Sequence, residues 1–298
     1  MNVRCIHSGR NFSRNGRTSN MSGTLYLCAT PIGNLGDITL RVLETLQEVD
    51  LIAAEDTRNT LKLLNHFEIK KPLTSYHEHN KYEKAEELIG HLLQGENIAV
   101  VTDAGTPAIS DPGEVLAAKC IEQGIRVTSL PGACALITAL TLSGMSARRF
   151  CFEGFLPTDK KQRRHILEAL KTEERTTILY ESPHHLKTTL GELLRALGDR
   201  KLTLCRELTK KYEEAVPMLL SEAVACYEEN EPRGEYVLVL EGADPEKKKE
   251  AEALSWQQLT PQEHVELYES QGLSRKEAMK KAAADRGVSK RDIYQALL

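Results

Sequence analysis

The stretch Ile98-Ala-Val-Val-Thr-Asp-Ala-Gly-Thr-Pro-Ala-Ile-Ser-Asp-Pro-Gly113 decides the fold, because it changes from a strand pattern to a loop and then to a helix. Its apolar start, residues 98–101, predicts a buried strand. Two glycines and two prolines then interrupt regular structure. Residues 114–123 follow with a helical pattern that ends at Gly124, a position typical of a helix-terminating glycine. Because α/β sheets bind ligands in loops after parallel strands, this loop is the first candidate for a functional site.

The same loop can also be interpreted as an ordinary connection between a strand and a helix. Such connections usually take about two to six residues, and this one is longer. It also contains more polar groups than a turn requires, namely Asp103, Thr106, Ser110 and Asp111. Length and polarity therefore favour a binding loop, with the simple connection as the alternative.

Strands and helices alternate on both sides of this stretch. We expect strands at residues 24–32, 51–54, 73–76, 98–101 and 126–130, with helices between them at 38–49, 59–66, 81–93 and 114–123. Asp37 is the expected N-cap of the first helix. The alternation predicts a parallel, doubly wound α/β sheet up to about residue 132.

A second α/β domain with a more mixed strand pattern follows. Its strands are expected at residues 150–155, 176–180, 202–206, 215–219 and 236–241, and its helices at 133–142, 160–170 and 183–197. A charged linker, residues 244–256, leads to short helices at 261–270, 274–286 and 289–297. The expected division is a disordered leader (1–22), an N-terminal α/β domain (23–132), a C-terminal α/β domain (133–243) and a linker with a helical module (244–298).

The end of the chain is basic. From Leu273 onwards there are seven bases and three acids, a net charge of +4. Short helices with tight turns and a basic end resemble a helix-turn-helix module. A helical appendage that packs on the rest of the protein has at least equal weight as an interpretation.

Composition sets further bounds. The chain has 298 residues, 41% hydrophobic and 28% charged, which is typical of a soluble globular protein of about two domains. Apolar runs are too short for a membrane span. The first 20 residues hold four arginines and no acid. We expect a disordered tail, or Met21 as the true start, with a transit peptide as the alternative; a secretory signal is excluded because there is no apolar core.

Charge and cysteine usage indicate the compartment and the kind of partner. Without the four leader arginines the net charge falls from -4 to -8, so nucleic-acid binding requires a local basic patch. The seven cysteines include no C-x-x-C pair and mostly lie in apolar runs. They predict buried free thiols in a reduced, cytoplasmic protein without structural zinc.

Four loops follow predicted strands of the first domain, and parallel strands bring such loops to one edge. They are residues 30–34, 55–58, 103–111 and 131–135. None fits the dinucleotide or P-loop pattern. The neighbours His184 and His185 lack the carboxylate spacing of a metal site, and His77 and His79 are better explained as structural or solvated. No serine hydrolase triad can be singled out.

Seven blocks in one order carry a family resemblance. They are Thr30-Pro-Ile-Gly-Asn-Leu-Gly-Asp-Ile-Thr39, Ala53-Ala-Glu-Asp-Thr-Arg58, Thr102-Asp-Ala-Gly-Thr-Pro-Ala-Ile-Ser-Asp-Pro-Gly113, Leu130-Pro-Gly132, Phe152-Glu-Gly-Phe-Leu-Pro157, Tyr180-Glu-Ser-Pro-His184 and Arg206-Glu-Leu-Thr-Lys210. From about residue 23 to 242 the chain closely resembles the bacterial 16S ribosomal RNA cytidine 2′-O-ribose methyltransferases, a branch of the tetrapyrrole methylase superfamily. Each block alone is weak, but their shared order is specific.

The resemblance implies two α/β domains that enclose S-adenosylmethionine in the cleft between them, in an enzyme that is usually a homodimer. It implies a cofactor site formed by Pro31, Asp103, Gly105, Thr106, Ile109, Cys134, Ala135 and Tyr180. Thr106 replaces the aspartate usual in the superfamily, a change typical of the ribosomal branch. Cys134 stands where serine is frequent, and we give it no catalytic role.

The implied reaction places a methyl group on the 2′-hydroxyl of a cytidine in 16S ribosomal RNA, with the small-subunit particle as the expected partner. The sulfonium methyl group is already electrophilic, so no metal is required. A positioned base or cationic donor would activate the hydroxyl. The candidates are Lys210, Glu55, Arg58 and Glu207, with Asp111 and Glu181 as further possibilities. Lys210 could act as a base if desolvated; otherwise Lys210 and Arg58 would clamp phosphate, or Lys210 and Glu207 would simply pair with each other.

Residues outside the cofactor loops are candidates for RNA contact. Lys160, Lys161, Arg163 and Arg164 lie beside residues 155–157, with a solvated helix face as the alternative, and the basic C-terminal helices are a second candidate. Two other functions stay open: a methyltransferase for a small, tetrapyrrole-like acceptor, and a non-enzymatic ribosome-binding protein. The Thr-Pro-Ile-Gly-Asn block differs from the glycine-rich block of porphyrin-modifying relatives and favours RNA.

Overall fold

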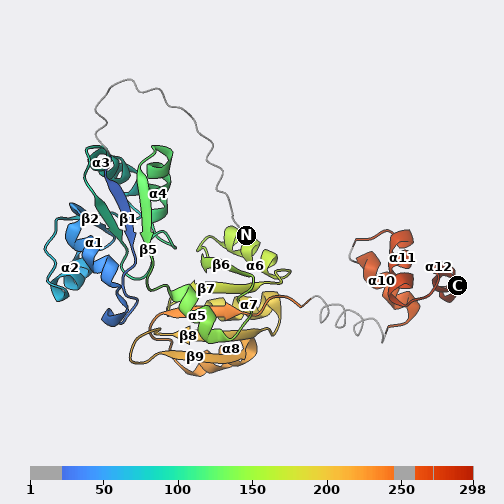
Figure 1. The fold of residues 1–298 in the computed structure, drawn as a ribbon. Coiled ribbons are helices and arrows are strands. Elements are labelled where there is room, and N and C mark those ends of the chain that lie inside the picture. The colour runs from blue at the N-terminus through green and yellow to red at the C-terminus, as the bar shows by residue number, and fades with distance from the viewer. Residues whose placement is uncertain (1–21, 245–258, 271, 298) are drawn as a thin grey trace, which may run out of the picture. The chain divides into compact units, whose positions relative to one another are not determined.

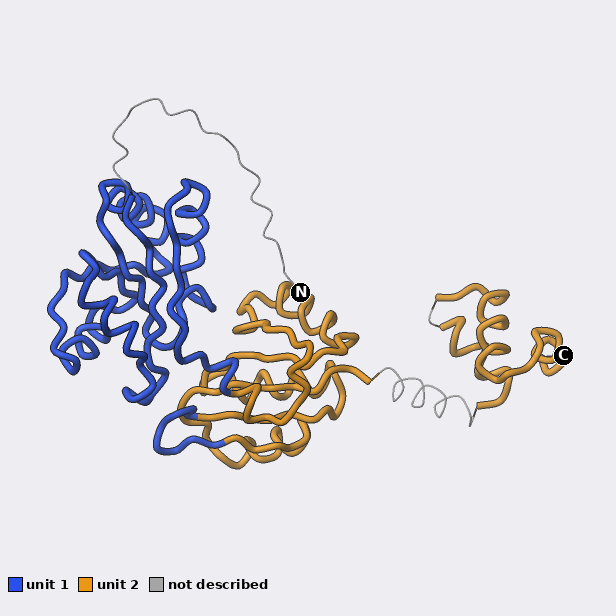
Figure 2. Tube along the Cα trace, viewed as in Figure 1, with its two compact units in different colours: residues 1–138, 207–214 blue, residues 139–206, 215–298 orange. Residues whose placement is uncertain are grey.

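The computed structural model describes residues 22–244, 259–270 and 272–297, and its contacts divide the chain into two compact units (Figures 1 and 2). Unit 1 comprises Met1–Thr138 with Glu207–Glu214, and unit 2 comprises Ala139–Arg206 with Ala215–Leu298. Almost all of the expected leader and linker lies outside the described residues. The domain boundaries expected from the sequence stay a prediction.

Unit 1 is built on a five-stranded sheet in the order β3-β2-β4-β1-β5, and every pair of neighbouring strands is parallel. The strands are β1 (Thr24–Cys28), β2 (Leu51–Ala54), β3 (Leu73–Ser75), β4 (Ile98–Val101) and β5 (Arg126–Leu130). The parallel α/β sheet predicted from the alternating pattern is therefore confirmed. β1 ends earlier than expected, because Thr30 already forms an isolated antiparallel bridge with Gly105.

Helices cover both faces of this sheet. They are α1 (Leu40–Glu48), α2 (Thr57–His66), α3 (Lys81–Leu93) and α4 (Gly113–Glu122), with a short 3-10 helix η1 at Leu35–Asp37. Helix α5 (Ala135–Ser143) begins in unit 1 and ends in unit 2, where β8 donates to its carbonyl groups. Val42 of α1 and Leu64 of α2 belong to one core cluster, whereas Leu88 of α3 and Leu116 of α4 belong to another. Two separate cores are what a doubly wound sheet requires.

The expected N-cap at Asp37 is wrong. The side chain of Thr39 caps α1 by accepting a hydrogen bond of 3.3 Å from the N–H of Val42. Asp37 instead ends η1, which is capped by the side chain of Asn34. The extra turn shifts the start of α1, and a helical pattern of apolar residues does not reveal such a shift.

Unit 2 contains a five-stranded sheet in the order β6-β7-β10-β8-β9. β6 is parallel to β7, while β10 is antiparallel to β7 and β8, so the mixed pattern is confirmed. The strands are β6 (Phe150–Phe155), β7 (Thr176–Glu181), β8 (Lys201–Arg206), β9 (Glu214–Leu219) and β10 (Tyr236–Leu240), and the helices are α6 (Lys160–Leu170), α7 (Leu186–Leu197) and α8 (Leu220–Glu229). Helix α8, which buries Leu220 and Ala223 in the core, was not expected from the sequence.

The C-terminal helices are α10 (Pro261–Ser270), α11 (Arg275–Asp285) and α12 (Lys290–Ala296), as expected from the sequence. They share a small core of their own. Gly287 follows α11 with a φ angle of +65°, the conformation expected of a helix-terminating glycine. Among the residues that the structure describes, no helix is long and apolar enough to cross a membrane.

Candidate functional site

The loops at the carboxyl ends of β1, β4 and β5 meet in unit 1. The N–H of Thr30 donates to the carbonyl of Gly105 at 2.9 Å, and the N–H of Gly105 donates to the carbonyl of Thr30 at 3.1 Å. The hydroxyl of Thr106 donates to the carbonyl of Ala133 at 3.0 Å. These bonds confirm that the loops predicted to converge do so.

The loop after β2 is tied to β4 by carboxylates. Glu55 accepts a hydrogen bond of 2.6 Å from the hydroxyl of Thr102 and a longer one of 3.4 Å from the N–H of Asp103. Asp103 in turn accepts from the N–H of Asp56 at 3.1 Å and from Asn59 at 3.3 Å. Burial, together with the nearby charge of Glu55, raises the pKa of Asp103 above its ordinary value. Glu55 and Asp103 thus hold the loop after β2 against the loop after β4.

Arg58 points to solvent from the start of α2. Its side chain is 86% exposed and forms an ion pair of 2.6 Å with Asp56. Hydrogen bonds from Arg58 lower the pKa of Asp56 to about 2. The guanidinium group is therefore available to a ligand that can compete with the carboxylate of Asp56, such as a phosphate group.

The loop between β4 and α4 is held by Asp111. Its carboxylate accepts backbone hydrogen bonds of 2.9 Å from Ala108, 3.1 Å from Ile109 and 2.8 Å from Gly113. Ala108 has a φ angle of +69° and Ser110 of +65°, a left-handed conformation that is unfavourable for residues other than glycine. Both oxygens of Asp111 are thus engaged in holding a strained loop, which removes the reason to consider it for proton transfer.

Glycines bring backbone segments close together beside these loops. Gly105 has a φ angle of +88°, and a Cβ atom there would lie 3.3 Å from Cγ2 of Ile32 and 3.6 Å from the carbonyl oxygen of Ala133. A Cβ atom on Gly132 would lie 2.7 Å from Cβ of Ala29. Such close approach leaves backbone groups to bind the polar edge of a ligand.

Most of the predicted cofactor residues lie on these loops of unit 1. The structure brings together Pro31, Asp103, Gly105, Thr106, Ile109, Cys134 and Ala135. Ile109 is 38% exposed, which is unusual for isoleucine and suits contact with a ligand. A cavity of about 250 Å³ is lined by Thr30, Pro31, Gly33, Leu35, Asn59, Thr60, Lys62, Leu63, Thr102 and Asp103.

Tyr180 belongs to unit 2, where it lies near the end of β7 against the rings of Phe152 and Phe155 at centroid distances of 4.8 and 5.6 Å. Its role stays a prediction from the resemblance.

The segment Glu207–Glu214 joins two strands of unit 2 but is part of unit 1 by its contacts (Figure 2). The ammonium group of Lys210 lies 3.0 Å from the carboxylate of Glu207, so the two side chains form an ion pair, and the roles expected of both residues stay predictions. Glu207 and Thr209 have φ angles of +50° and +64°. Backbone strain of this kind clusters at functional sites. The sequence did not predict the left-handed conformation, because neither position is a glycine.

Gly33 lies at the site but is not among the residues predicted to form it. A Cβ atom at this position would lie 2.4 Å from Cγ of Lys210, so the lysine stem occupies the space that any side chain would need. The structure therefore connects the Thr-Pro-Ile-Gly-Asn block to the Arg-Glu-Leu-Thr-Lys block.

A second polar network lies in unit 2. Glu181 is 6% exposed and accepts hydrogen bonds from the N–H of Ser182, at 2.7 Å, and from the hydroxyl of Thr189. Arg163 donates to the same hydroxyl at 2.7 Å and pairs with Glu192. Arg163 is thus only 14% exposed and was wrongly included among the RNA-contacting candidates. Lys160, Lys161 and Arg164 are exposed as expected.

The cysteines in the described residues are free thiols: Cys28, Cys120 and Cys205 are buried, Cys134 and Cys151 are intermediate and Cys226 is exposed. Burial raises the pKa of Cys28 to about 12 and that of Cys120 to about 11, so both thiols are poor nucleophiles. Within the same part of the chain, no group of three or more His, Cys, Asp or Glu residues could hold a metal ion.

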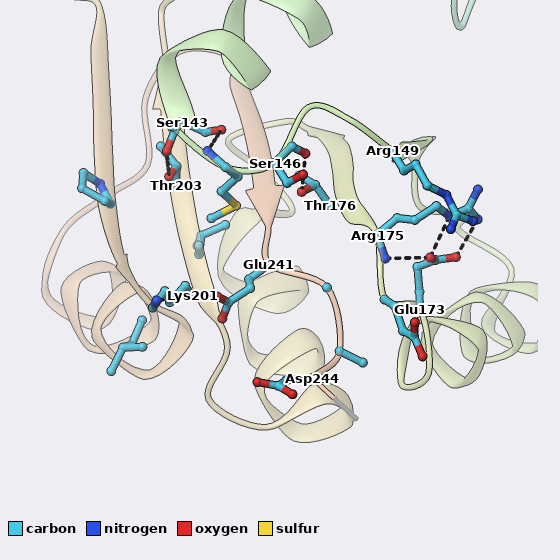
Figure 3. Close-up of a pocket in the computed structure, with 18 of the residues that line it drawn as sticks. Ser143, Ser146, Arg149, Glu173, Arg175, Thr176, Lys201, Thr203, Glu241 and Asp244 are labelled. Carbon is cyan, nitrogen blue, oxygen red and sulfur yellow. Dashed lines mark hydrogen bonds and ion pairs between the residues drawn. The ribbon is translucent and has the colours of Figure 1, made fainter. Parts of the chain in front are cut away.

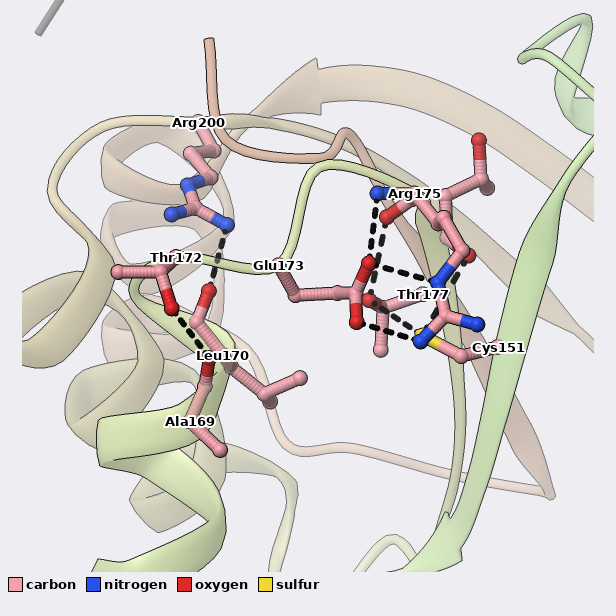
Figure 4. Close-up of polar contacts among 9 residues, drawn as sticks. Cys151, Ala169, Leu170, Thr172, Glu173, Arg175, Thr177 and Arg200 are labelled. Carbon is pink, nitrogen blue, oxygen red and sulfur yellow. Dashed lines mark hydrogen bonds and ion pairs between the residues drawn. The ribbon is translucent and has the colours of Figure 1, made fainter. Parts of the chain in front are cut away.

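Unit 2 also contains an open cavity of about 1500 Å³ (Figure 3). It lies beside Thr176 and Lys201, the first residues of β7 and β8, whereas Tyr180 lies near the other end of β7. Glu173 and Arg175 form an ion pair of 2.7 Å on its rim (Figure 4), and hydrogen bonds from Arg175 lower the pKa of Glu173 to about 2. None of the predicted site residues lines this cavity.

Comparison with known proteins agrees with this arrangement. Residues 24–224 match the family of tetrapyrrole (corrin/porphyrin) methylases. The chain belongs to this family. The predicted fold class and the prediction of a methyltransferase are thereby confirmed.

Relatives of high sequence similarity include several that carry the name ribosomal RNA small subunit methyltransferase I. The protein from Halalkalibacterium halodurans is 54% identical over 91% of this chain and 93% of its own length. The protein from Thermotoga maritima is 46% identical over 74% of this chain and 100% of its own length.

Solved structures share the fold at low sequence identity. A diphthine synthase is 14% identical with a TM-score of 0.60, covering 74% of this chain and 90% of its own. A uroporphyrin-III C-methyl transferase from Thermus thermophilus, solved with S-adenyl homocysteine, is 18% identical with a TM-score of 0.53, covering 74% of this chain and 97% of its own. These similarities support the tetrapyrrole methylase fold of this chain.

Proposed function

We propose that this chain transfers the methyl group of S-adenosylmethionine to the 2′-hydroxyl of a cytidine in the 16S ribosomal RNA of the small subunit. The names of the curated relatives support ribosomal RNA as the acceptor, and the neighbour solved with S-adenyl homocysteine supports the methyl donor. The sulfonium of the donor supplies an electrophilic methyl group. The single observation that carries the proposal is the placement of Lys210 over Gly33, beside the convergent loops of unit 1.

The residues of unit 1 fit the methyl donor. Gly105 has a backbone conformation that favours glycine, and the loop around it is held in shape by Asp111. Exposed Ile109 offers apolar contact for an adenine ring or a methionine chain, and the carboxylate of Asp103 offers an acceptor for hydroxyl or amino groups. We assign these residues, with Pro31, Thr106, Cys134 and Ala135, to holding the donor.

Lys210 is best suited to hold the acceptor hydroxyl. Its ammonium group lies 3.0 Å from the carboxylate of Glu207, which fixes the direction in which the side chain points. An ammonium group cannot take the proton of the hydroxyl, but it can donate a hydrogen bond to the oxygen on which negative charge develops. We therefore assign Lys210 to donation and Glu207 to positioning Lys210.

The other two catalytic candidates receive different roles. Glu55 holds the β2 and β4 loops through Thr102 and Asp103, and we assign it to fixing the shape of the site. Arg58 is exposed and already pairs with the carboxylate of Asp56, so we assign it to an RNA phosphate.

The setting of the enzyme is also part of the proposal. The cysteines in the described residues are free thiols, which is typical of proteins in a reducing compartment, and we therefore propose a cytoplasmic location. We also propose that the enzyme is a homodimer. A small tetrapyrrole-like acceptor is less well supported, because the solved porphyrin and corrin enzymes are only 17–19% identical and share the fold alone.

The test offers labelled S-adenosylmethionine with three acceptors: small ribosomal subunits without the modification, naked ribosomal RNA, and a uroporphyrin-type tetrapyrrole. We expect label in the RNA of the small subunits and none in the tetrapyrrole. Label in the tetrapyrrole alone would establish the small-molecule alternative. Donor binding without transfer to any acceptor would instead support the non-enzymatic ribosome-binding protein.

A further inference from the structure

The exposed cations of α11 and α12 form a second feature with a function of its own. Arg275 pairs with Glu269 and Lys281 lies over the ring of Tyr268. The other four are Lys276, Lys280, Lys290 and Arg291, here called the basic surface. We propose that the basic surface binds the phosphate backbone of the RNA substrate, separately from the methyl-transfer site. The identity of that RNA rests on the proposed function, but binding itself does not require methyl transfer.

The helices that carry the basic surface have their own core. Val265 and Tyr268 of α10 pack with Met279 of α11 and Ile293 of α12, and all four are at most 9% exposed. The hydroxyl of Tyr268 donates to Asp285 at 2.6 Å, which ties α10 to α11. The cations are therefore presented by a compact scaffold.

The acids of α11 and α12 are occupied by contacts within the C-terminal helices. Glu277 accepts a hydrogen bond of 3.1 Å from the N–H of Ser274, and Asp292 accepts one of 2.9 Å from the N–H of Ser289, so both act at helix N-termini. Asp285 is engaged by Tyr268. Within the described ranges, none of the four cations of the basic surface has an acidic partner.

Folding alone does not explain these cations. Lys276 and Lys280 are four residues apart on α11, where like charges repel each other. Lys290 and Arg291 begin α12, although cations are unfavourable at the start of a helix. Tyr294, one turn after Lys290, is 56% exposed and offers a ring on which an RNA base can stack. Cations beside an exposed aromatic ring suit single-stranded RNA.

The charge of the rest of the chain strengthens the assignment. Without the four leader arginines and the residues from Leu273 onwards, the chain has 28 bases and 40 acids, so its net charge repels RNA. The family match ends at residue 224, before these helices begin. The relative from Thermotoga maritima is matched over its full length by 74% of this chain. The basic surface therefore lies outside the residues matched by the family.

The test compares two full-length variants with equal charge change. One replaces Lys276, Lys280, Lys290 and Arg291 by glutamine. The control replaces four exposed cations elsewhere by glutamine, namely Lys70, Arg126, Lys171 and Lys187. Fluorescence anisotropy with a labelled single-stranded RNA is measured over a salt series, with duplex DNA of equal length alongside. Circular dichroism checks that both variants fold.

For the variant of the basic surface we expect RNA affinity to fall about 10–100-fold at low salt and the slope of log K against log salt to decrease by about 3, because each lost phosphate contact removes about 0.7. Donor affinity should not change, and methylation of small subunits should weaken through KM. The control should stay within about twofold of the wild type in each measurement.

If the folded variant of the basic surface kept the RNA affinity and the salt slope of the wild type, the proposal would be overturned. It would also be overturned if the wild type bound duplex DNA more tightly than RNA and this DNA binding were lost in the variant. If the wild type transferred no methyl group, the proposed function would fail, while the RNA affinities would still decide the role of the basic surface.

Discussion

Lys210 lies against Gly33 so closely that a Cβ atom on the glycine would be 2.4 Å from Cγ and 3.0 Å from Cε of the lysine. Real Cβ atoms do not approach other carbons to 2.4 Å, so a side chain at position 33 and the present position of Lys210 exclude each other. The contact joins two segments that are far apart in the sequence. It also gives a physical reason for glycine in the loop after β1: the loop leaves space for a cation.

Replacing Gly33 by alanine should displace Lys210 without removing any of its atoms. We expect kcat for methyl transfer to fall about 10–100-fold, since small misplacement of a reacting group has effects of this order. Donor affinity, measured by calorimetry, should change less than about twofold. The control is Gly90→Ala, since Gly90 lies in α3 with no atom within 4 Å of the added carbon. Unchanged kcat in Gly33→Ala would show that the position of Lys210 is irrelevant.

Substitutions of Lys210 itself distinguish charge from bulk. Lys210→Gln should lower kcat about 10²–10³-fold, the usual effect of losing one donor to a developing negative charge. Lys210→Arg should keep part of the activity because it keeps the charge and the ion pair with Glu207. Single-turnover rates for both variants provide the measurement. Equal loss in both would favour a base, because arginine does not give up its proton.

Asp111→Ala should loosen the loop that we assign to the methyl donor. The change leaves three backbone N–H groups without their acceptor, which costs about 1–3 kcal/mol for each one that water cannot reach. We expect weaker donor binding and a lower midpoint in urea unfolding. Asp111→Asn is the control, as it keeps one oxygen acceptor and should lie between wild type and Asp111→Ala. Wild-type donor affinity in Asp111→Ala would remove this loop from the donor site.

The Glu173–Arg175 pair predicts a pH dependence of stability. The pKa of Glu173 is lowered from 4.5 to about 2 in the folded protein, so the pair contributes its full stabilisation above about pH 4.5 and loses it as the pH falls toward 2. Glu173→Gln should therefore lower Tm relative to wild type at pH 7, and the difference should shrink between pH 4.5 and 2. A Tm difference that is independent of pH over this range would contradict the assignment.

Local patterns predicted much of the fold because each element has a clear period and clear ends. The bounds of α3, β4, β5 and β6 match the prediction. Helix α8 was not predicted, although Leu220, Ala223, Val224 and Tyr227 follow the helical spacing and pack in the core of unit 2. The N-cap at Thr39 was not predicted because the 3-10 helix before it has no strong sequence signal.

The candidate site was partly predictable for a topological reason. Parallel strands place their following loops at one edge, so convergence of residues 30–34 with 103–111 follows from the strand pattern alone. The contact of Lys210 with Gly33 could not be predicted in this way. It depends on a left-handed backbone conformation at Glu207 and Thr209, and glutamate and threonine do not predict that conformation from sequence.

Nucleoside analysis of the acceptor tests the central claim most directly. Unmodified small ribosomal subunits are incubated with the enzyme and S-adenosylmethionine, and their RNA is digested and analysed by mass spectrometry. We predict one 2′-O-methylcytidine per subunit with the wild type and strongly reduced formation with Gly33→Ala. A methyl group on a base, on another nucleoside, or on no nucleoside at all would contradict the account.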